Sequence, residues 1–233
     1  MDVKIIVDDD MKELPIRVIV MYFTVNKVTN SQVHPLVYEE ALKVIDKYKR
    51  TYNLSTLKDL PNIKLFREFL WRIKIDPTKM RPSHEALLRR VLRTGEFPKI
   101  NTIVDIGNLV SLKYLVPIGI YDLDKVKPPL VFRYSIDGEA FYPIGSDAAK
   151  ILRAGIPVLA DSEKVLHIFP HRDSKFSAVS IKTNRILAIV GGVEGIPLST
   201  LKSSVNNLVD YLTRYCDAED ISDVKVVVFG GRE

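Results

Sequence analysis

The chain has 233 residues, of which 46% are hydrophobic and 27% are charged, a balance typical of a globular protein in water. Its apolar runs are all shorter than the roughly 18 residues of a membrane helix, which argues against a membrane protein. One cysteine excludes an internal disulfide framework and a cysteine-based zinc site, and a net charge of +5 identifies no partner by itself.

The first residues are typical of a strand and not of a targeting segment. The opening MDVKIIVDDDMKELP has acidic residues where a signal peptide is basic, and its apolar stretch is too short for one. We therefore expect a cytoplasmic protein without membrane association. Residues 3–7 and 16–25 are rich in Val, Ile, Tyr and Phe, and both runs are predicted to form strands.

Three helices are predicted next. Pro35 suits the first turn of a helix over about 36–50, and the apolar spacing over 55–72 predicts a second helical region with an interruption at Pro61. The segment RPSHEALLRRVLRTGEFP indicates a third helix, with Ser83 as its N-cap and Gly95 at its end.

The pattern changes in the second half of the chain. An apolar helix over about 102–115 precedes short β-branched or alternating runs, such as PLVFRYSI and AVSIKT, separated by Gly, Pro and Asp. A helix over 200–214 and the strand KVVVFG follow. Helices in front and strands behind, without regular βαβ alternation, predict an α+β fold of one domain over residues 1–233.

Basic side chains are concentrated in residues 64–99. This segment holds ten Lys and Arg against four acidic residues, an excess of six that exceeds the +5 of the whole chain. Such a segment suits a polyanion such as RNA. We expect the arginines of the third helix to contact RNA, namely Arg81, Arg89, Arg90 and Arg93. The alternative is a solvated face of two amphipathic helices.

The common catalytic signatures are absent from the sequence. There is no Walker loop, no GxGxxG, no HExxH and no GxSxG. His167 and His171 are four residues apart, but they flank IFP, which is predicted as a strand and a turn, so a two-histidine metal site is disfavoured. We expect no metal and no cofactor.

Two polar residues interrupt the apolar helix over 102–115. Asp105 and Asn108 are three residues apart and share one helix face, so they could line a cavity together. An Asn side chain offers donors and an acceptor for a substrate carbonyl or a water. Alternatively, Asp105 pairs with an arginine or caps a helix, and Asn108 satisfies buried backbone. Pro117 and Gly119 then form either a pocket wall or a plain turn.

Further polar residues are predicted at strand ends. Glu139 lies in GEAF, and His171 and Asp173 lie in HRDS. Loops carried on a sheet often hold binding and catalytic groups. These residues are therefore candidates for substrate contact, with a solvated loop as the alternative for each.

A long part of the chain resembles a known family. The segment RPSHEALLRRVLRTGEFPKINTIVDIGNLVSLKYLVPIGIYDLDKV, and later FRYSIDGEAFYPIG, GIPVLADSEKVL and HRDSKFSAVSIKTNRILAI, resemble the editing module of the phenylalanyl-tRNA synthetase beta subunit, its B-three/B-four domain. The likeness is closer to free-standing proteins made of that domain, and it covers about residues 60–215. The resemblance implies helices packed on a β-sandwich-like strand set.

The resemblance also assigns roles to single positions. VDIGNLV corresponds to a helix that lines the editing pocket, so Asn108 falls on the pocket asparagine, and its neighbours Asp105 and Gly107 are expected to help bind the substrate. Pro117 falls on the proline of the next loop. The family pattern there is Pro-x-His-x-Phe-Asp, whose histidine positions the reacting ester, and this chain has Gly119 instead.

A pocket glutamate of the family falls close to Asp173. The resemblance therefore implies a trans-acting editing hydrolase that deacylates mischarged tRNA, with Asn108 and Asp173 as catalytic residues and the aminoacylated 3′ end of tRNA as partner. The alternatives are a non-catalytic module that binds tRNA, other RNA or an amino acid, and a protein acting on a small metabolite. A full tRNA ligase is not expected, because the chain is short and lacks an ATP-binding motif, and no DNA is expected as partner.

Overall fold

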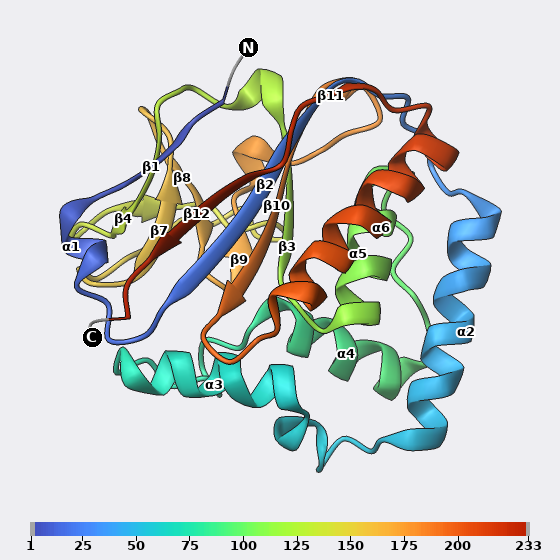
Figure 1. The fold of residues 1–233 in the computed structure, drawn as a ribbon, viewed down its shortest axis with the longest axis horizontal. Coiled ribbons are helices and arrows are strands. Elements are labelled where there is room, and N and C mark those ends of the chain that lie inside the picture. Colours follow the sequence, from blue (N-terminus) through green and yellow to red (C-terminus); the bar gives the residue numbers. More distant parts are fainter. Residues whose placement is uncertain (1–2, 232–233) are drawn as a thin grey trace.

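Two β-sheets organise residues 3–231, the part of the chain that the computed structural model describes (Figure 1). The first sheet is antiparallel, in the order β11–β2–β10–β3, and β12 also pairs with β2. Its strands are β2 (Val18–Lys27), β3 (Ile118–Asp122), β10 (Ile186–Val193), β11 (Glu219–Ile221) and β12 (Lys225–Phe229). The long strand β2 is buried for most of its length, as its Val- and Ile-rich sequence predicts.

The second sheet has the order β1–β4–β7–β8–β9. Only β1 and β4 are parallel, and the other pairings are antiparallel. Its strands are β1 (Ile5–Val7), β4 (Leu130–Tyr134), β7 (Pro157–Ala160), β8 (Val165–Ile168) and β9 (Arg172–Asp173). A small hairpin sheet pairs β5 (Ala140–Phe141) with β6 (Lys150–Ile151).

The helices lie mainly on the outer face of the first sheet. In Figure 1, α2, α5 and α6 cover this face, the second sheet lies on the opposite face, and α3 runs along one end. The helices are α1 (Asp9–Lys12), α2 (Pro35–Thr51), α3 (Pro61–Arg72), α4 (Ser83–Thr94), α5 (Thr102–Tyr114) and α6 (Leu198–Cys216). Short 3-10 turns are η1 (Leu57–Asp59), η2 (Leu123–Lys125) and η3 (Lys175–Ser177).

Aromatic side chains join the two sheets. The ring centroids of Phe132 in β4 and Phe229 in β12 are 5.2 Å apart, and Phe169 after β8 lies 6.2 Å from Phe132. The sheets therefore share one apolar core, and the predicted α+β class, with helices on a sandwich-like strand set, is confirmed. The helix over 102–115 is apolar on nearly all sides because it is buried between α2, α4, α6 and β3.

One predicted cap is wrong. Ser83 is the first residue of α4 and Pro82 is its N-cap, without a side-chain hydrogen bond. The Ser83 backbone N–H instead donates to the Pro170 carbonyl at 2.9 Å, which ties the start of α4 to the turn between β8 and β9. A tertiary hydrogen bond thus satisfies a group that a local cap would otherwise serve.

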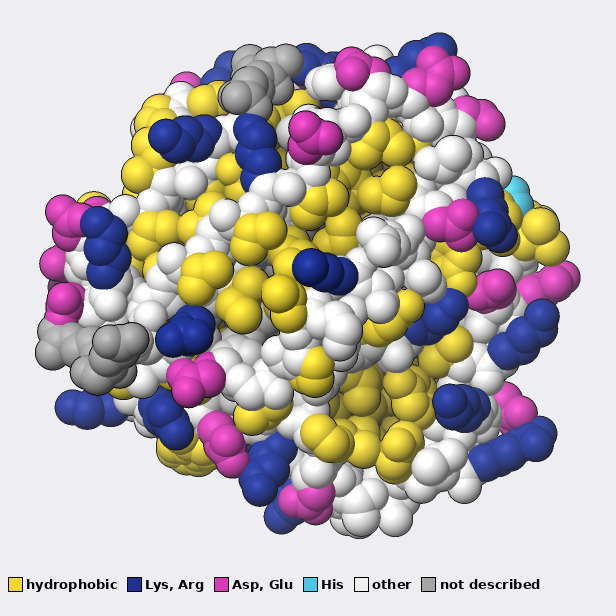
Figure 2. Space-filling model, viewed as in Figure 1, with side chains coloured by type: hydrophobic (Ala, Val, Ile, Leu, Met, Phe, Trp, Pro, Cys, Tyr) yellow, Lys and Arg dark blue, Asp and Glu magenta, His cyan; other side chains and the backbone are white. Residues whose placement is uncertain are grey.

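Charges are interspersed on the face shown in Figure 2. Acidic and basic side chains are interspersed there, while apolar side chains gather over β12 and the residue before it, where Val224, Val226 and Val228 are exposed. This face therefore offers no field of a single sign to a charged partner. Within residues 3–231, no helix combines the length and the apolar character that a membrane crossing needs.

Candidate functional site

A cavity of about 280 Å³ lies between α5, β3 and the segment that follows β8. Its walls are mostly apolar, and two polar side chains, Asn108 and Asp173, line it from different elements. The volume is just below the range of about 300–1,000 Å³ typical of ligand pockets, so the cavity suits a small ligand. Apolar walls with a few convergent polar groups are the usual composition of a binding site.

Asn108 comes from the middle of α5. Its side chain is half-buried and makes no hydrogen bond to any residue within 3–231. By contrast, Asn101 on the same helix is engaged, because its side-chain oxygen accepts from the Val104 backbone N–H at 3.1 Å and caps the helix. The Asn108 amide is thus free to donate and to accept toward a ligand in the cavity.

Gly107 lets β3 pack closely against α5. A Cβ atom at this position would lie 2.8 Å from Cδ1 of Ile120 in β3. A glycine inside a helix costs about 1 kcal/mol relative to alanine. Gly107 lines the cavity beside Asn108. The close packing of α5 against β3, which form two walls of the cavity, offsets the cost of this glycine.

Asp173 is held by two neighbours from different strands. Its Oδ1 accepts from the Tyr121 hydroxyl at 2.7 Å and lies 2.8 Å from His167 Nδ1. A carboxylate only accepts, so Nδ1 carries the proton in this pair. Burial, with the nearby Asp173 charge and its hydrogen bond, raises the pKa of Tyr121, which stays a neutral donor. Asp173 Oδ2 makes no hydrogen bond to the described residues and is available to a ligand.

Gly119 makes room for this arrangement. A Cβ atom at Gly119 would overlap the hydroxyl of Tyr121, which lies two residues further along β3 on the same face of the strand. Pro117, Gly119, Tyr121 and His167 also line a void of about 10 Å³ next to the main cavity, roughly the room that one water needs. The Tyr121 hydroxyl therefore occupies the space where a side chain at position 119 would begin.

Sequence reasoning missed Tyr121 and His167. The signal for Tyr121 was the spacing Gly-x-Tyr in a strand, which places both positions on one face. For His167, the only signal was its place in an alternating run. Its partner Asp173 lies on the neighbouring strand β9, opposite His167, and that pairing becomes visible only once the strands are aligned.

Asp105 lies beside the cavity and supports its wall. Its side chain is 3% exposed, and Oδ1 accepts from the Ile100 backbone N–H at 3.0 Å. Ile100 in turn lines the cavity. Burial raises the pKa of Asp105 from 3.8 to about 6, although backbone hydrogen bonds from Ile100 and Asn101 act in the opposite direction. Of the two alternatives for Asp105, an ion pair with an arginine or a helix cap, the hydrogen bond from Ile100 is closer to a cap at the start of α5.

The raised pKa of Asp105 predicts a pH-dependent stability. The folded state holds this proton more tightly than the unfolded state, so its contribution is complete below pH 3.8 and is lost as the pH rises through about 6. The free energy of unfolding of the wild type is expected to fall, relative to Asp105→Asn, between pH 4 and pH 6.5. Urea unfolding of both proteins across this range measures the difference, and parallel curves would contradict the assignment.

Glu139 and His171 do not line the cavity. Glu139 forms a two-pronged ion pair with Arg133 and accepts from the Ile136 backbone N–H at 3.1 Å, so it braces the hairpin turn. His171 Nδ1 donates to the Arg81 carbonyl at 2.8 Å, and burial lowers its pKa. Their side chains are engaged in contacts within the protein.

The four arginines predicted to contact RNA fall into two groups. Arg81 and Arg89 surround the fully buried carboxylate of Glu85, at 3.5 Å and 2.8 Å, together with Arg67 at 3.1 Å. Arg90 and Arg93 are exposed and form no ion pair with the described residues. The positive charge of this segment is therefore partly neutralised inside the fold. Arg81 and Arg89, which were expected to contact RNA, instead pair with Glu85.

Among residues 3–231, no group of three or more His, Cys, Asp or Glu side chains is arranged to hold a metal ion. His167 and His171 have separate partners, Asp173 and the Arg81 carbonyl.

Several relatives carry the same name. The chain is 30% identical over 155 residues to the phenylalanine–tRNA ligase beta subunit of Protochlamydia amoebophila, covering 66% of this chain and 19% of that protein. The corresponding subunit of Fusobacterium nucleatum is 33% identical over 117 residues, covering 50% and 14%. That of Yersinia pestis is 30% identical over 100 residues, covering 43% and 12%. The chain thus spans less than a fifth of the length of these relatives.

A solved structure and a family model complete the comparisons. An N-terminal fragment of the phenylalanyl-tRNA synthetase beta subunit from Pyrococcus horikoshii aligns with 97% of this chain and 50% of its own, at 17% identity and a TM-score of 0.46. The family model described as the B3/4 domain matches residues 65–217, close to the segment that carries the sequence resemblance. That match extends over more than half of the chain, which therefore belongs to the B3/4 domain family.

Proposed function

We propose that this protein is an aminoacyl-tRNA editing hydrolase, which acts in trans and in the cytoplasm to remove a wrongly attached amino acid from tRNA. The observation that carries the proposal is the pair of polar groups in the cavity. The Asn108 amide and Asp173 Oδ2 have no partner among residues 3–231 and line one small apolar space. The names of the relatives, ligase beta subunits for phenylalanine and its tRNA, support tRNA as the substrate.

The cavity suits an amino acid esterified to a ribose. Its apolar walls, among them Val104, Ile118 and Ile120, fit an apolar side chain. In this proposal, the Asn108 N–H groups hold the ester carbonyl and stabilise the negative charge that develops on its oxygen. Asp173 Oδ2 is the acceptor for a proton from the attacking water.

The reaction is a simple hydrolysis. The water oxygen forms a bond to the carbonyl carbon, and the bond from that carbon to the ribose oxygen breaks. The water proton passes to Asp173 and then to the departing ribose oxygen, so the products are a free amino acid and tRNA with its hydroxyl restored. An ester is activated compared with an amide, so positioning and one base suffice.

A binding module without catalysis is the second candidate. The absence of a side chain at Gly119, where the family pattern has histidine, favours it. A carboxylate and an amide in an apolar cavity would also hold a free amino acid through its ammonium and carboxylate groups.

The deciding experiment follows ester loss from a panel of labelled aminoacyl-tRNAs, beginning with tyrosyl-tRNA for phenylalanine. The wild type is expected to hydrolyse one mischarged species above the spontaneous rate. Asn108→Ala is expected to lower its kcat by about 10²–10³-fold, the usual loss when one oxyanion donor is removed. Asn206→Ala, an exposed site on α6, is the matched control and should behave as the wild type.

The outcomes separate the two candidates. Equal loss of tRNA binding and turnover in Asn108→Ala would contradict the role given to its amide. Absence of hydrolysis across the whole panel, with tRNA binding intact, would contradict the enzyme and identify the binding module.

A further inference from the structure

A second cavity, of about 360 Å³, lies between the segment joining α3 to α4 and strand β6. Four cationic side chains line it, Lys74 and Lys79 from one side and Lys150 and Arg153 from the other, with a single acidic residue, Asp76. Four cations and one carboxylate leave an excess of three positive charges.

These cations are free, whereas Arg81 and Arg89 near the start of α4 are paired with Glu85. All four are exposed, and none forms an ion pair with a residue in 3–231. Asp76 is occupied locally, because Oδ1 accepts from the backbone N–H and the hydroxyl of Thr78 at 2.8 Å and 2.7 Å. The positive charges of this cavity are therefore exposed to solvent and available to a ligand.

Lys74 is held in an unusual backbone conformation. Its φ is +60°, and it follows α3 at the position where a helix end normally has glycine. The Ile75 N–H donates to the Leu70 carbonyl at 2.8 Å and the Lys74 N–H to the Trp71 carbonyl at 3.0 Å, the two hydrogen bonds of a Schellman motif. A lysine in this left-handed position is strained, and such strain is concentrated at functional sites.

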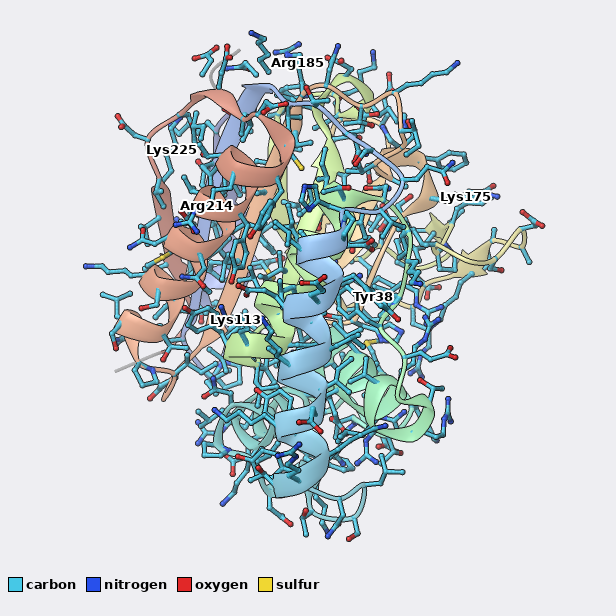
Figure 3. The ribbon with its side chains drawn as sticks, turned by 90° about the vertical axis from the view of Figure 1, so that its right-hand side faces the viewer. Tyr38, Lys113, Lys175, Arg185, Arg214 and Lys225 are labelled. Carbon is cyan, nitrogen blue, oxygen red and sulfur yellow. The ribbon has the colours of Figure 1, made fainter. Side chains whose placement is uncertain are left out.

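The hairpin around β5 and β6 connects this cavity to the first one. Ile144 lines the cavity of Asn108, and its N–H donates to the Asp173 carbonyl at 3.0 Å. Lys150 and Arg153, at the other end of the hairpin, line the basic cavity. Figure 3 shows the pale yellow hairpin projecting near Lys175, on the side of the view away from α6. The hairpin thus contributes lining residues to both cavities.

We infer that the basic cavity binds the phosphate backbone of the RNA strand whose aminoacylated end enters the first cavity. The RNA as partner rests on the proposed function, whereas the place of its phosphates rests on the charges and contacts given above. Four unpaired cations suit successive phosphates, and the apolar floor of Ile75, Met80 and Leu152 suits sugar surfaces. This surface takes the place of the α4 arginines as the main electrostatic contact.

The test measures binding of uncharged tRNA to the full chain at several salt concentrations. The double variant Lys150→Gln/Arg153→Gln is expected to weaken binding and to reduce the slope of log K against log salt by about 2, since each lost phosphate contact removes about 1. The matched control is Arg90→Gln/Arg93→Gln, which removes the same charge from the exposed face of α4 and should leave the slope near that of the wild type.

A third variant separates binding from folding. Lys74→Gly removes one cation and places glycine where the backbone is left-handed, so its Tm should equal or exceed that of the wild type. Its salt slope should nevertheless fall by about 1. A stable Lys74→Gly with unchanged affinity and slope would overturn the assignment of this cavity.

The remaining outcomes are also decisive. Loss of tRNA binding in the α4 double variant, with the cavity double variant unaffected, would overturn the inference and move the interface to α4. If the wild type binds no tRNA at any salt concentration, the inference fails, and hydrolysis of small amino-acid esters still tests the first cavity separately. If tRNA binds as expected but no ester is hydrolysed, the inference stands and the hydrolase does not.

Discussion

Replacing Asp173 with asparagine is expected to reduce kcat for ester hydrolysis by about 10²–10⁴-fold, the usual contribution of a general base. The asparagine keeps the shape of the side chain and can still accept the Tyr121 hydrogen bond, which is 2.7 Å long in the wild type. What it loses is the ability of Oδ2 to take a proton from water. The KM should change less than kcat, because the walls of the cavity stay in place.

The separate effects of the substitution on kcat and on KM identify the role of Asp173. A general base requires kcat to fall in Asp173→Asn while KM stays close to that of the wild type. Asp137→Asn removes the same charge from an exposed turn and is the matched control. A rise in KM with kcat unchanged would contradict a general base and would instead make Asp173 the group that holds the substrate ammonium.

Local patterns predicted the helices well. The helix expected over 102–115 is α5 (Thr102–Tyr114), and the helix expected over 200–214 is α6 (Leu198–Cys216). Periodic apolar residues define one buried face within a single segment, so no distant partner is needed to predict them. The helix period also placed Asp105 and Asn108 on one face, but Asn108 lines the cavity and Asp105 does not.

Contacts between distant segments could not be predicted in the same way. Tyr121 and Asp173 are 52 residues apart and meet only because β3 and β9 belong to two sheets that pack together. The basic cavity likewise combines the end of α3 with a hairpin some 75 residues later, near Lys150. Composition located the basic segment, but only the fold shows which of its cations remain free.

The arginines around Glu85 are an intermediate case. The positions 81, 85 and 89 are spaced by four, the spacing of opposite charges that pair on a helix face, so the ion pairs with Glu85 could have been expected. The third partner, Arg67, comes from α3 and gives no local signal. With Arg67 packed against Glu85, the ion pairs near the start of α4 become a buried cluster.

Replacing Glu85 with alanine is expected to lower the free energy of unfolding by about 3–5 kcal/mol, the usual cost of removing one partner from a buried ion pair. The Glu85 side chain is fully buried, and Arg67 and Arg89, its closest partners, are only 17% and 28% exposed. Without the carboxylate, these guanidinium groups stay partly desolvated and repel one another. Urea unfolding at neutral pH measures the loss.

Glu68→Ala on α3 is the matched control. Glu68 is exposed and lies 3.9 Å from Lys64, and exposed pairs of this kind contribute about 0–1 kcal/mol. If Glu85→Ala and Glu68→Ala lose the same small amount, the arginines must turn to solvent freely, and the cluster would not stabilise the fold.

The Glu85 substitution should also affect hydrolysis at the first cavity. The Arg81 carbonyl accepts from His171 at 2.8 Å, and the Ser83 N–H donates to the Pro170 carbonyl, so the start of α4 holds the turn that leads into β9 and Asp173. Loosening Arg81 is therefore expected to lower hydrolysis even at temperatures where the variant is folded, with tRNA affinity kept by the basic cavity. Loss of tRNA affinity in place of hydrolysis would return the α4 arginines to the role of an RNA contact. Loss of hydrolysis alone would make them the support of the site.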